Sequence, residues 1–403
     1  MRNRHDVFIT INIQVFFLII FQFASMVAQA QSSIDSVMAS VLMNNKAIQA
    51  TAQYEEFRKL QYKTSLFPQN PQLEYDYLKG SPSNVGNQTE IVAFQTFDFP
   101  SAYAKRKQLA KEQIAQSEQH LIIKRREILL ETKLVCIELV YRNKLNKELI
   151  QRKSNSDSLL KFFEKKLNLG DGNILDVNKV RLQLLAVNSE YQENIMMINQ
   201  LNSRLTALNG GKSIAFSDTS YFSETDIPTF EKLQVQFEAA DPLLLILEQE
   251  KLIVQKEMEL TRALSYPRFE AGYHYQGILG QNYNGFHTGI TIPLWENKNK
   301  VKSLKSKVLF TDLELWDHKN EHYHEMSQLY EKYKNLEIIM VEYQNMFLNL
   351  NSDYLLNKSL TSGHLSAIEY FMEINYYATA MNNYLRIEKE YYQTIAELYK
   401  FEL

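Results

Sequence analysis

Two stretches of 69 residues, 101–169 and 294–362, contain neither proline nor glycine. Each begins after a proline and ends before a glycine: Pro100 and Gly170 bracket the first, and Pro293 and Gly363 bracket the second. Within the first stretch, apolar residues recur every three or four positions with Arg, Lys and Glu between them, which is the period of an amphipathic helix. At a rise of about 1.5 Å per residue, each stretch predicts a helical rod roughly 100 Å long, which no compact globular domain holds.

The matching positions of these helix breakers indicate that the chain consists of two related halves. The stretches are offset by 193 residues, and the same offset aligns Asp176 with Glu369. A repeat this long indicates duplication of a whole architecture rather than a short solenoid. We expect a first repeat over 31–209, a linker rich in Ser, Asp and Thr over 210–229, and a second repeat over 230–403.

Each repeat is expected to run helix, two strands, long helix, turn, helix. In the first repeat we expect a helix over 34–66, strands over 72–77 and 90–99, and a returning helix over 173–208. In the second repeat we expect strands over 268–276 and 286–292 joined by a turn over 277–284, and a returning helix over 364–401.

Residues 1–30 have the three parts of a secretory signal peptide. Residues 1–5 are basic, Val7 to Phe23 is largely apolar, and Ala28-Gln29-Ala30 is the small-x-small pattern that signal peptidase cleaves. We therefore expect an exported chain that begins near Gln31 after cleavage. An uncleaved anchor helix is the alternative.

The strands alternate between apolar and polar residues. One face is expected to carry Tyr75, Tyr77, Tyr273 and Tyr275, and the other Glu74, Asp76, Glu270 and His274. Strands of about ten residues suit a tilted membrane strand, with the tyrosines toward lipid and the charged residues toward a lumen. Four strands cannot close a barrel, and an open edge in lipid leaves backbone groups unsatisfied, so the chain would have to oligomerise. A soluble sheet that caps a coiled coil is the alternative.

Composition and motifs argue against several classes of function. A formal net charge of −3 with a pI near 6.3 gives no basic footprint for nucleic acid. Cys136 is the only cysteine, so it forms no disulfide within the chain and is expected to pack as a small hydrophobe. Gly211-Lys212-Ser213 lacks the first glycine and the preceding strand of a phosphate-binding loop. No nucleophile–base arrangement is present either, so we expect neither an enzyme nor a cofactor.

One helical face deserves comparison with a metal site. His318, Glu321, His322 and Glu325 follow the i, i+3, i+4, i+7 spacing, and imidazoles with carboxylates could hold zinc or copper. The same spacing is typical of a solvated polar stripe on a long helix, and we favour that interpretation.

The duplicated helix–strand–strand–helix unit resembles the TolC-like outer-membrane efflux proteins along essentially the whole mature chain. The residues that carry the resemblance are Asn70-Pro71-Gln72-Leu73, Phe97-Asp98-Phe99-Pro100, Ile290-Thr291-Ile292-Pro293-Leu294, Leu169-Gly170-Asp171-Gly172-Asn173-Ile174-Leu175-Asp176-Val177 and Ser362-Gly363. The resemblance implies a mainly helical fold with membrane strands, in which a homotrimer builds a twelve-stranded β-barrel above a long α-helical barrel. It also implies a location in the outer membrane of a Gram-negative bacterium, extending into the periplasm.

The resemblance further implies the function and the partners. Such a channel is the exit duct of a tripartite pump and receives metal cations, drugs or other cargo from an inner-membrane efflux pump through a periplasmic adaptor, the membrane fusion protein. The length is most similar to the cation-efflux branch, which includes CusC- and CzcC-like proteins. This chain departs from that branch because it has no lipidated cysteine and because Asn45-Lys46 stands where relatives have Asn-Pro. A non-transporting periplasmic coiled-coil scaffold or adaptor is the alternative function.

The two helix turns lie at the predicted ends of the rods, far from the strands. By resemblance, the turn residues are expected to dock the adaptor: Leu169, Gly170, Asp171, Ser362, Gly363 and His364. Asp176 and Glu369 match positions where relatives carry acids at a narrow entrance, and threefold symmetry would gather each into a ring. A second acid that some relatives carry after the equivalent of Glu369 is Met372 here.

Overall fold

The computed structural model describes residues 33–222, 227–349, 358–359, 362, 365 and 367–403. The predicted signal peptide, Gly363 and His364 lie outside the described residues. The chain divides into two compact units, and each unit takes segments from both halves of the sequence. The tip unit comprises the described residues up to Lys46, Arg126–Phe230 and Ser327–Leu403, and the sheet unit comprises Ala47–Arg125 and Glu231–Met326.

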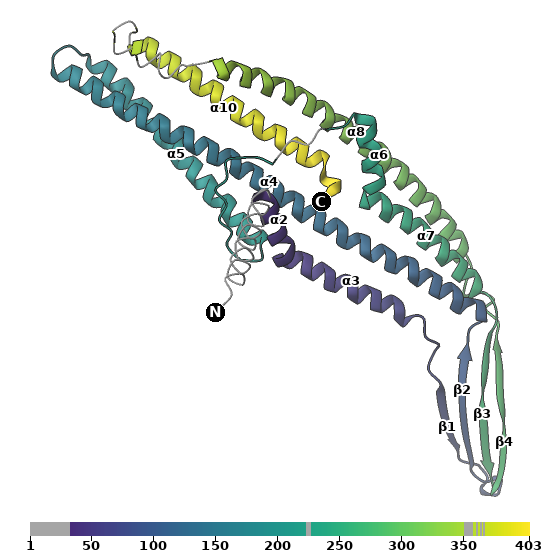
Figure 1. The fold of residues 1–403 in the computed structure, drawn as a ribbon. Coiled ribbons are helices and arrows are strands. Elements are labelled where there is room, and N and C mark those ends of the chain that lie inside the picture. The colour runs from purple at the N-terminus through teal and green to yellow at the C-terminus, as the bar shows by residue number, and fades with distance from the viewer. Residues whose placement is uncertain (1–32, 223–226, 350–357, 360–361, 363–364, 366) are drawn as a thin grey trace, which may run out of the picture. The chain divides into compact units, whose positions relative to one another are not determined.

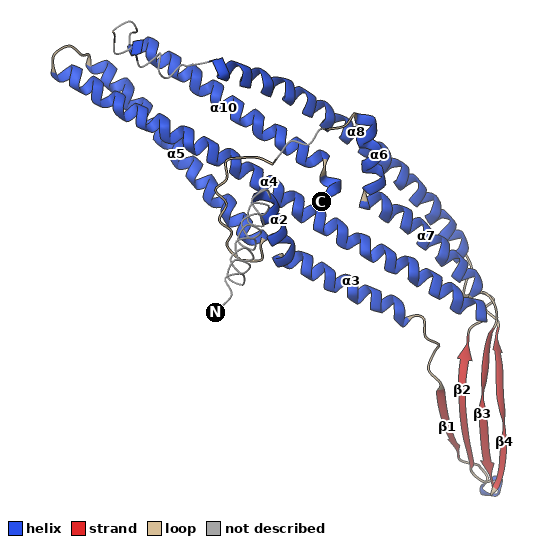
Figure 2. Cartoon of the chain, viewed as in Figure 1, coloured by secondary structure: helices blue, strands red, loops and turns tan. Residues whose placement is uncertain are grey.

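The sheet unit contains one antiparallel sheet of four strands in the order β1-β2-β3-β4 (Figures 1 and 2). The strands are β1 (Gln72–Leu78), β2 (Gln88–Phe97), β3 (Arg268–Ile278) and β4 (Gln281–Thr291). Each half of the sequence supplies one hairpin, and the hairpins join because β2 pairs with β3. The predicted pair of strands in each half is therefore confirmed.

The turn of the second hairpin is shorter than predicted. We expected residues 277–284 to turn the chain, but β3 continues to Ile278 and β4 begins at Gln281. Only Leu279 and Gly280 connect them, with φ of 49° and 75°. Two residues with positive φ fit the twist of a tight hairpin, whereas leucine rarely adopts this conformation and so gives no turn signal in the sequence.

The helices follow the predicted order in both halves. The first half forms α2 (Ser33–Asn44), α3 (Lys46–Thr64), α4 (Pro100–Asn168) and α5 (Ile174–Leu208). The second half forms α6 (Phe230–Ala240), α7 (Pro242–Ala263), α8 (Lys300–Asn349) and α10 (Ala367–Leu398). Short 3-10 turns, η1 (Ser83–Val85) and η2 (Lys400–Glu402), complete the described elements. No described helix has an apolar stretch long enough to cross a bilayer.

Two predicted helices differ most from the structure. The helix expected over 34–66 is interrupted at Asn45, whose buried side-chain amide donates to the Leu208 carbonyl oxygen at 2.7 Å. The first long rod is confirmed by the 69 residues of α4, but the second begins only at Lys300. Asn299 has φ of 65°, and Lys298 N donates to the Trp295 carbonyl oxygen at 3.1 Å, so a turn precedes α8.

The core of the tip unit lies along the middle of α4. Cys136, Ile137, Leu139 and Val140 are fully buried there. Burial raises the pKa of the Cys136 thiol to about 12, so the side chain stays protonated and packs as an apolar group, as predicted.

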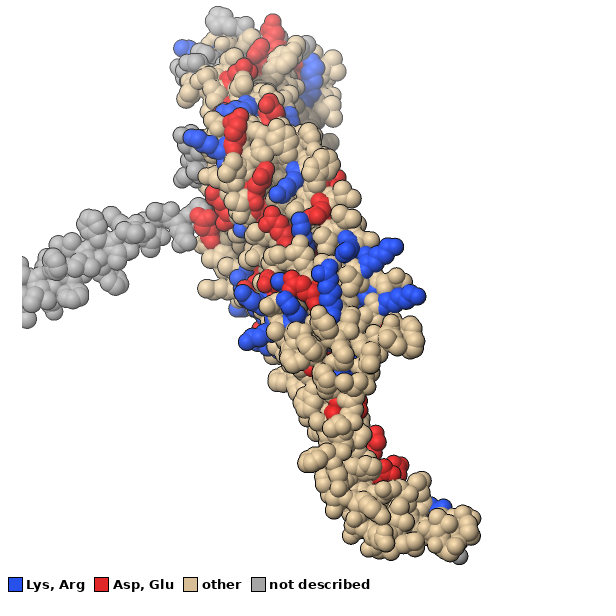
Figure 3. Space-filling model, turned by 90° about the vertical axis from the view of Figure 1, so that its right-hand side faces the viewer, with Lys and Arg blue, Asp and Glu red and all other residues tan. Residues whose placement is uncertain are grey.

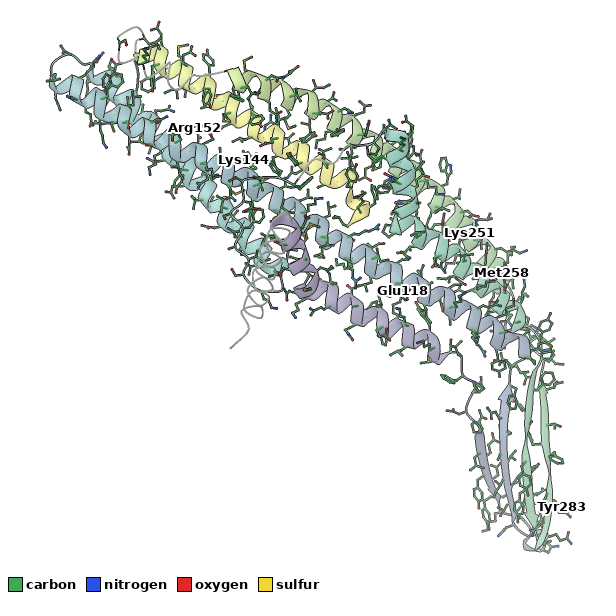
Figure 4. The ribbon with its side chains drawn as sticks, viewed as in Figure 1. Glu118, Lys144, Arg152, Lys251, Met258 and Tyr283 are labelled. Atoms are coloured by element: carbon green, nitrogen blue, oxygen red, sulfur yellow. The ribbon has the colours of Figure 1, made fainter. Side chains whose placement is uncertain are left out.

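The segment between the halves is tied to α4 and α10 within the tip unit. Asn143 donates to the Asp218 carbonyl oxygen at 3.0 Å, and the Tyr221 ring stacks on Tyr392 with centroids 4.2 Å apart. Lys144 (Figure 4) lies 4.6 Å from the Tyr221 ring and binds both carboxylate oxygens of Glu388 at 2.7 Å. These contacts fix the linker where the two halves meet.

Candidate functional site

The four strands form two chemically distinct faces, which the register defines. Tyr75 pairs with Ile91, which pairs with Tyr275, and Ala93 pairs with Tyr273, so these residues share one face. We term this the apolar face. Its members are Leu73, Tyr75, Tyr77, Thr89, Ile91, Ala93, Gln95, Phe97, Phe269, Ala271, Tyr273, Tyr275, Gly277, Asn282, Asn284, Phe286, Thr288 and Ile290.

The opposite face, termed the polar face, carries every charged residue of the strands. These are Glu74, Asp76, Glu90, Arg268 and Glu270, and His274 and His287 lie beside them. The grouping predicted from the sequence is confirmed for all four tyrosines and for Glu74, Asp76, Glu270 and His274.

Side-chain pairs link residues of the polar face across strands and to acids just beyond the sheet. His274 Nε2 lies 2.7 Å from Glu90 Oε1, so a histidine of β3 meets an acid of β2. At the end of the sheet near the helices, Arg268 binds Glu296 at 2.6 Å and lies 3.6 Å from Asp98. The sequence analysis missed Glu90 and His287, because only the strand register shows which side they occupy.

Glycines are also concentrated on the polar face. Gly272, Gly285 and Gly289 lie there, whereas Gly277 lies on the apolar face. A Cβ atom at Gly272 would stand 2.2 Å from the Ala93 carbonyl oxygen, so this position requires glycine. Small residues on one face leave room there and suit the inner side of a curved sheet.

The two outer strands each pair on one side only. β1 pairs with β2 and β4 with β3, and all seven residues of β1 are exposed. The helices that adjoin these strands in sequence carry exposed apolar stripes. On α3 the stripe is Tyr54, Phe57 and Leu60, which are 54–57% exposed, and on α8 it is Leu309, Leu313 and Trp316, which are 66–68% exposed.

The stripe on α8 points away from the helix that α8 packs against. Lys307 binds Glu250 of α7 at 2.8 Å, and Asp312 binds Lys251 of α7, which is labelled in Figure 4. Leu313 is six positions beyond Lys307, so it lies on the other side of the helix. No described segment of this chain therefore covers the stripe.

In the tip unit, α4 and α5 are joined by the turn 169–173. Gly170 has φ of 82°, with no atom within 4 Å of a Cβ built there, whereas a Cβ at Gly172 would stand 2.5 Å from Leu167 N. Asn173 caps α5 by accepting a hydrogen bond from Leu175 N at 2.9 Å. Leu169 and Asp171 are exposed on the turn. Gly172 is the structurally demanding position that the sequence analysis did not single out.

The predicted entrance acids occupy equivalent places on two helices. Asp176 lies in the first turn of α5 and Glu369 in the first turn of α10. Their chain neighbours Val177 and Tyr370 are buried in one apolar cluster with Val180. Asp176 also lies 3.4 Å from Lys179. Acids at these positions complement the positive end of a helix dipole, which is a structural role in its own right.

The other predicted site residues are placed as follows. Ser362 is exposed, and its backbone N donates to the Lys358 carbonyl oxygen at 3.0 Å, while Gly363 and His364 are not described. On α8, His318 Nε2 lies 3.0 Å from Asp241 and His322 packs on the Phe237 ring with centroids 3.8 Å apart.

Glu321 and Glu325 are exposed, and no three metal-ligating side chains of the described part of the chain come together. The stripe is not simply solvated, because His322 is buried.

The fold resembles solved structures of channels. CusC, whose structures concern folding and transmembrane channel formation, matches with a TM-score of 0.78 and 13% identity over 92% of each chain. The outer membrane protein VceC of Vibrio cholerae matches with a TM-score of 0.73 and 11% identity over 92% of this chain and 96% of its own. The outer membrane channel CmeC of Campylobacter jejuni matches with a TM-score of 0.68 and 13% identity over 92% of this chain and 85% of its own.

The chain has the fold of TolC-like channels. The predicted fold class, mainly helical with four β-strands per chain, is confirmed. No family model and no curated protein matches the sequence. At such low identity the TolC-like assignment rests on the architecture, in which two hairpins and two long helices repeat along the chain.

Proposed function

We propose that this chain is a subunit of an outer-membrane channel that serves as the exit duct of a tripartite efflux pump in a Gram-negative bacterium. The observation that carries the proposal is the sheet, which places all its charges on one face and leaves both outer edges unpaired. The TolC-like fold supports the same role, because the proteins it matches include outer-membrane channels. In this role the protein is not an enzyme and needs no cofactor.

We infer that the apolar face meets lipid and that the polar face lines the lumen. Tyr75, Tyr273 and Phe286 are 49–95% exposed on the apolar face, which is expensive in water but favourable against acyl chains. Charged residues and small glycines on the other face suit a water-filled interior.

Tyr273 and His274 are neighbours on opposite faces and provide a matched test. Tyr273→Arg is expected to destabilise the inserted protein by about 2–4 kcal/mol, whereas His274→Arg should cost much less. Unfolding of each variant from lipid vesicles, followed by tryptophan fluorescence, measures the difference. Equal costs at the two positions would refute the orientation.

We infer that the chain forms a homotrimer in which β4 of one subunit pairs with β1 of the next. Three subunits of four strands supply twelve strands and leave no open edge. The exposed stripes on α3 and α8 adjoin the same two outer strands, so one head-to-tail contact would cover an edge and both stripes together.

Leu313→Glu in the α8 stripe is expected to reduce trimer formation, because it places a carboxylate in the apolar contact. Val235→Glu is the matched control, since Val235 is 69% exposed on α6, away from the outer strands. Light scattering of the purified protein in detergent gives the subunit number. A wild-type protein that is monomeric and soluble without detergent would contradict the channel and favour a scaffold.

The tip residues Leu169, Gly170, Asp171, Ser362, Gly363 and His364 are proposed to dock the periplasmic adaptor. The exposed Leu169 and the open space around Gly170 are consistent with a contact surface. The cargo is proposed to be set by the inner-membrane pump, since a wide duct selects weakly.

Gly170→Trp is expected to abolish efflux, because no described atom lies within 4 Å of a Cβ built there and a larger side chain would project into the proposed docking surface. Since the φ of Gly170 is 82°, any side chain there strains the turn, so the amount of trimer that reaches the membrane is measured beside efflux. Lys232→Trp, at an exposed position of α6, is the control and should keep efflux. Efflux in cells that carry the cognate pump and adaptor is the measurement. Undiminished efflux in the Gly170 variant would exclude docking at this turn.

Asp176 and Glu369 are proposed to line the entrance. Replacing both by the neutral amides should lower the preference for cations in planar bilayers, because three copies of each acid would otherwise attract cations. Asp157→Asn, which removes an exposed acid from α4, should leave the preference unchanged. If the double variant conducts like the wild type, the two acids serve only their helices.

A further inference from the structure

A strongly basic segment follows the sheet directly. Residues 297–311 contain five lysines and no acidic residue. The lysines are Lys298, Lys300, Lys302, Lys305 and Lys307, and all five are exposed. The segment begins six residues after β4 ends and includes the start of α8, so it lies beside the end of the sheet that adjoins the helices.

Most of these lysines have no acidic partner in the part of the chain that the structure describes. Lys307 binds Glu250 at 2.8 Å, and this hydrogen bond raises the pKa of Lys307. Lys300 donates to Asn297 Oδ1 at 3.2 Å. Among the described residues, Lys298, Lys302 and Lys305 form no ion pair. The segment therefore presents uncompensated positive charge to its surroundings.

Two of these lysines lie where the helix dipole of α8 disfavours positive charge. Lys300 and Lys302 lie in the first turn of α8, which has no acidic residue. The N-terminal end of a helix carries partial positive charge, so cations there are unfavourable. A chain that breaks a local rule without an internal gain often does so for function, and here an anion outside the chain would remove the conflict.

Exposed aromatic and apolar side chains separate the lysines from the strands. Trp295 is 76% exposed, Leu294 is 67% exposed and Phe67 is 74% exposed. Tyr266 is half exposed and packs on Phe99 with ring centroids 4.9 Å apart. Tryptophan and tyrosine favour the boundary between acyl chains and water. Along the chain, the strand is followed by aromatic residues and then by lysines. Across one leaflet, the acyl chains are followed in the same order by the boundary with water and then by the phosphate groups.

The surface view shows where the charged side chains lie. In Figure 3 blue Lys and Arg side chains, with red acidic side chains among them, lie on the helical part, while the visible surface of the sheet is largely tan. At the opposite end of the sheet, Tyr283 lies on β4 near the hairpin turn (Figure 4). The basic segment therefore belongs to the side of the sheet from which the helices extend.

We propose that residues 297–311 bind the phosphate groups of anionic phospholipids in the periplasmic leaflet of the outer membrane. The proposal rests on the proposed function, since the sheet must span the membrane for the segment to reach that leaflet. Each lysine near an anionic surface strengthens the attraction by about fivefold. Three subunits would present a ring of such segments around the base of the barrel.

The test uses the mature full-length trimer in detergent and short-chain lipids below their micellar concentration. Phosphatidylglycerol and phosphatidylcholine with the same chains are titrated separately, and the shift in melting temperature reports binding. Phosphatidylglycerol is expected to give the larger shift. In the K298Q/K300Q/K302Q/K305Q variant its apparent affinity should fall at least about tenfold.

The matched control is K161Q/K165Q/K232Q/K332Q, which removes the same charge at exposed positions that form no ion pair among the described residues. It should keep the wild-type preference. Wild-type protein alone provides a second measurement, because an electrostatic preference must shrink as ionic strength rises. This measurement holds even if the quadruple variant fails to assemble.

Several results would overturn the proposal. The wild type could respond equally to both lipids, or the K298Q/K300Q/K302Q/K305Q variant could keep the preference for phosphatidylglycerol. The preference of the wild type could also be independent of ionic strength. Glycerol phosphate could also stabilise the trimer as much as the lipid does, which would indicate a site for small anions instead. A trimer without lipid preference refutes only this inference, whereas a detergent-free monomer refutes the proposed function and the inference with it.

Discussion

The unpaired backbone edges of β1 and β4 are the constraint on which the rest of this structure depends. In water such an edge is a risk of aggregation, but in lipid each unsatisfied N–H or C=O group costs several kcal/mol. The apolar face, with tyrosines and Phe286 exposed, suits lipid and not water. A lone subunit thus fits neither environment. The contradiction disappears when neighbouring subunits pair their edges, and the uncovered stripes on α3 and α8 are what such a neighbour would cover.

The charged residues of the polar face are partly paired with one another. Its residues pair across strands, as His274 does with Glu90, and Arg268 gathers acids at the end near the helices. In the proposed channel a lumen would keep such pairs hydrated, whereas buried pairs in a dry core often cost more than they return. The glycines on the same face would leave space for that water. The placement of the charges on one face and the need to pair the outer strand edges therefore both favour the proposed channel.

Much of this architecture could be predicted from the sequence. The helical period, the two-residue period of the strands and a few proline and glycine residues indicate where the elements lie. Pro100 and Gly170 bracketed α4 correctly, and alternation assigned the strand faces. The sequence-based predictions failed where a single residue has an unusual backbone conformation or a long-range contact. Leu279 takes positive φ in a two-residue turn, and the helix is interrupted at Asn45, whose side chain donates a hydrogen bond to the distant Leu208. Neither residue propensity nor hydrophobic periodicity predicts such local exceptions. The exposed stripe on α8 can be recognised only when the side of α8 that packs on α7 is known.

The charged residues in the first turns of α5, α10 and α8 differ in whether the helix dipole alone explains them. α5 and α10 carry Asp176 and Glu369 in their first turns, where acids agree with the helix dipole and would be expected in any stable helix. Their agreement means that position alone does not require a role at the entrance. α8 begins instead with Lys300 and Lys302, which oppose the dipole and lack acidic partners among the described residues. A placement that local physics disfavours needs an external reason. By this criterion, the basic segment beside the sheet is a stronger indication of a binding surface than the acids near the tip.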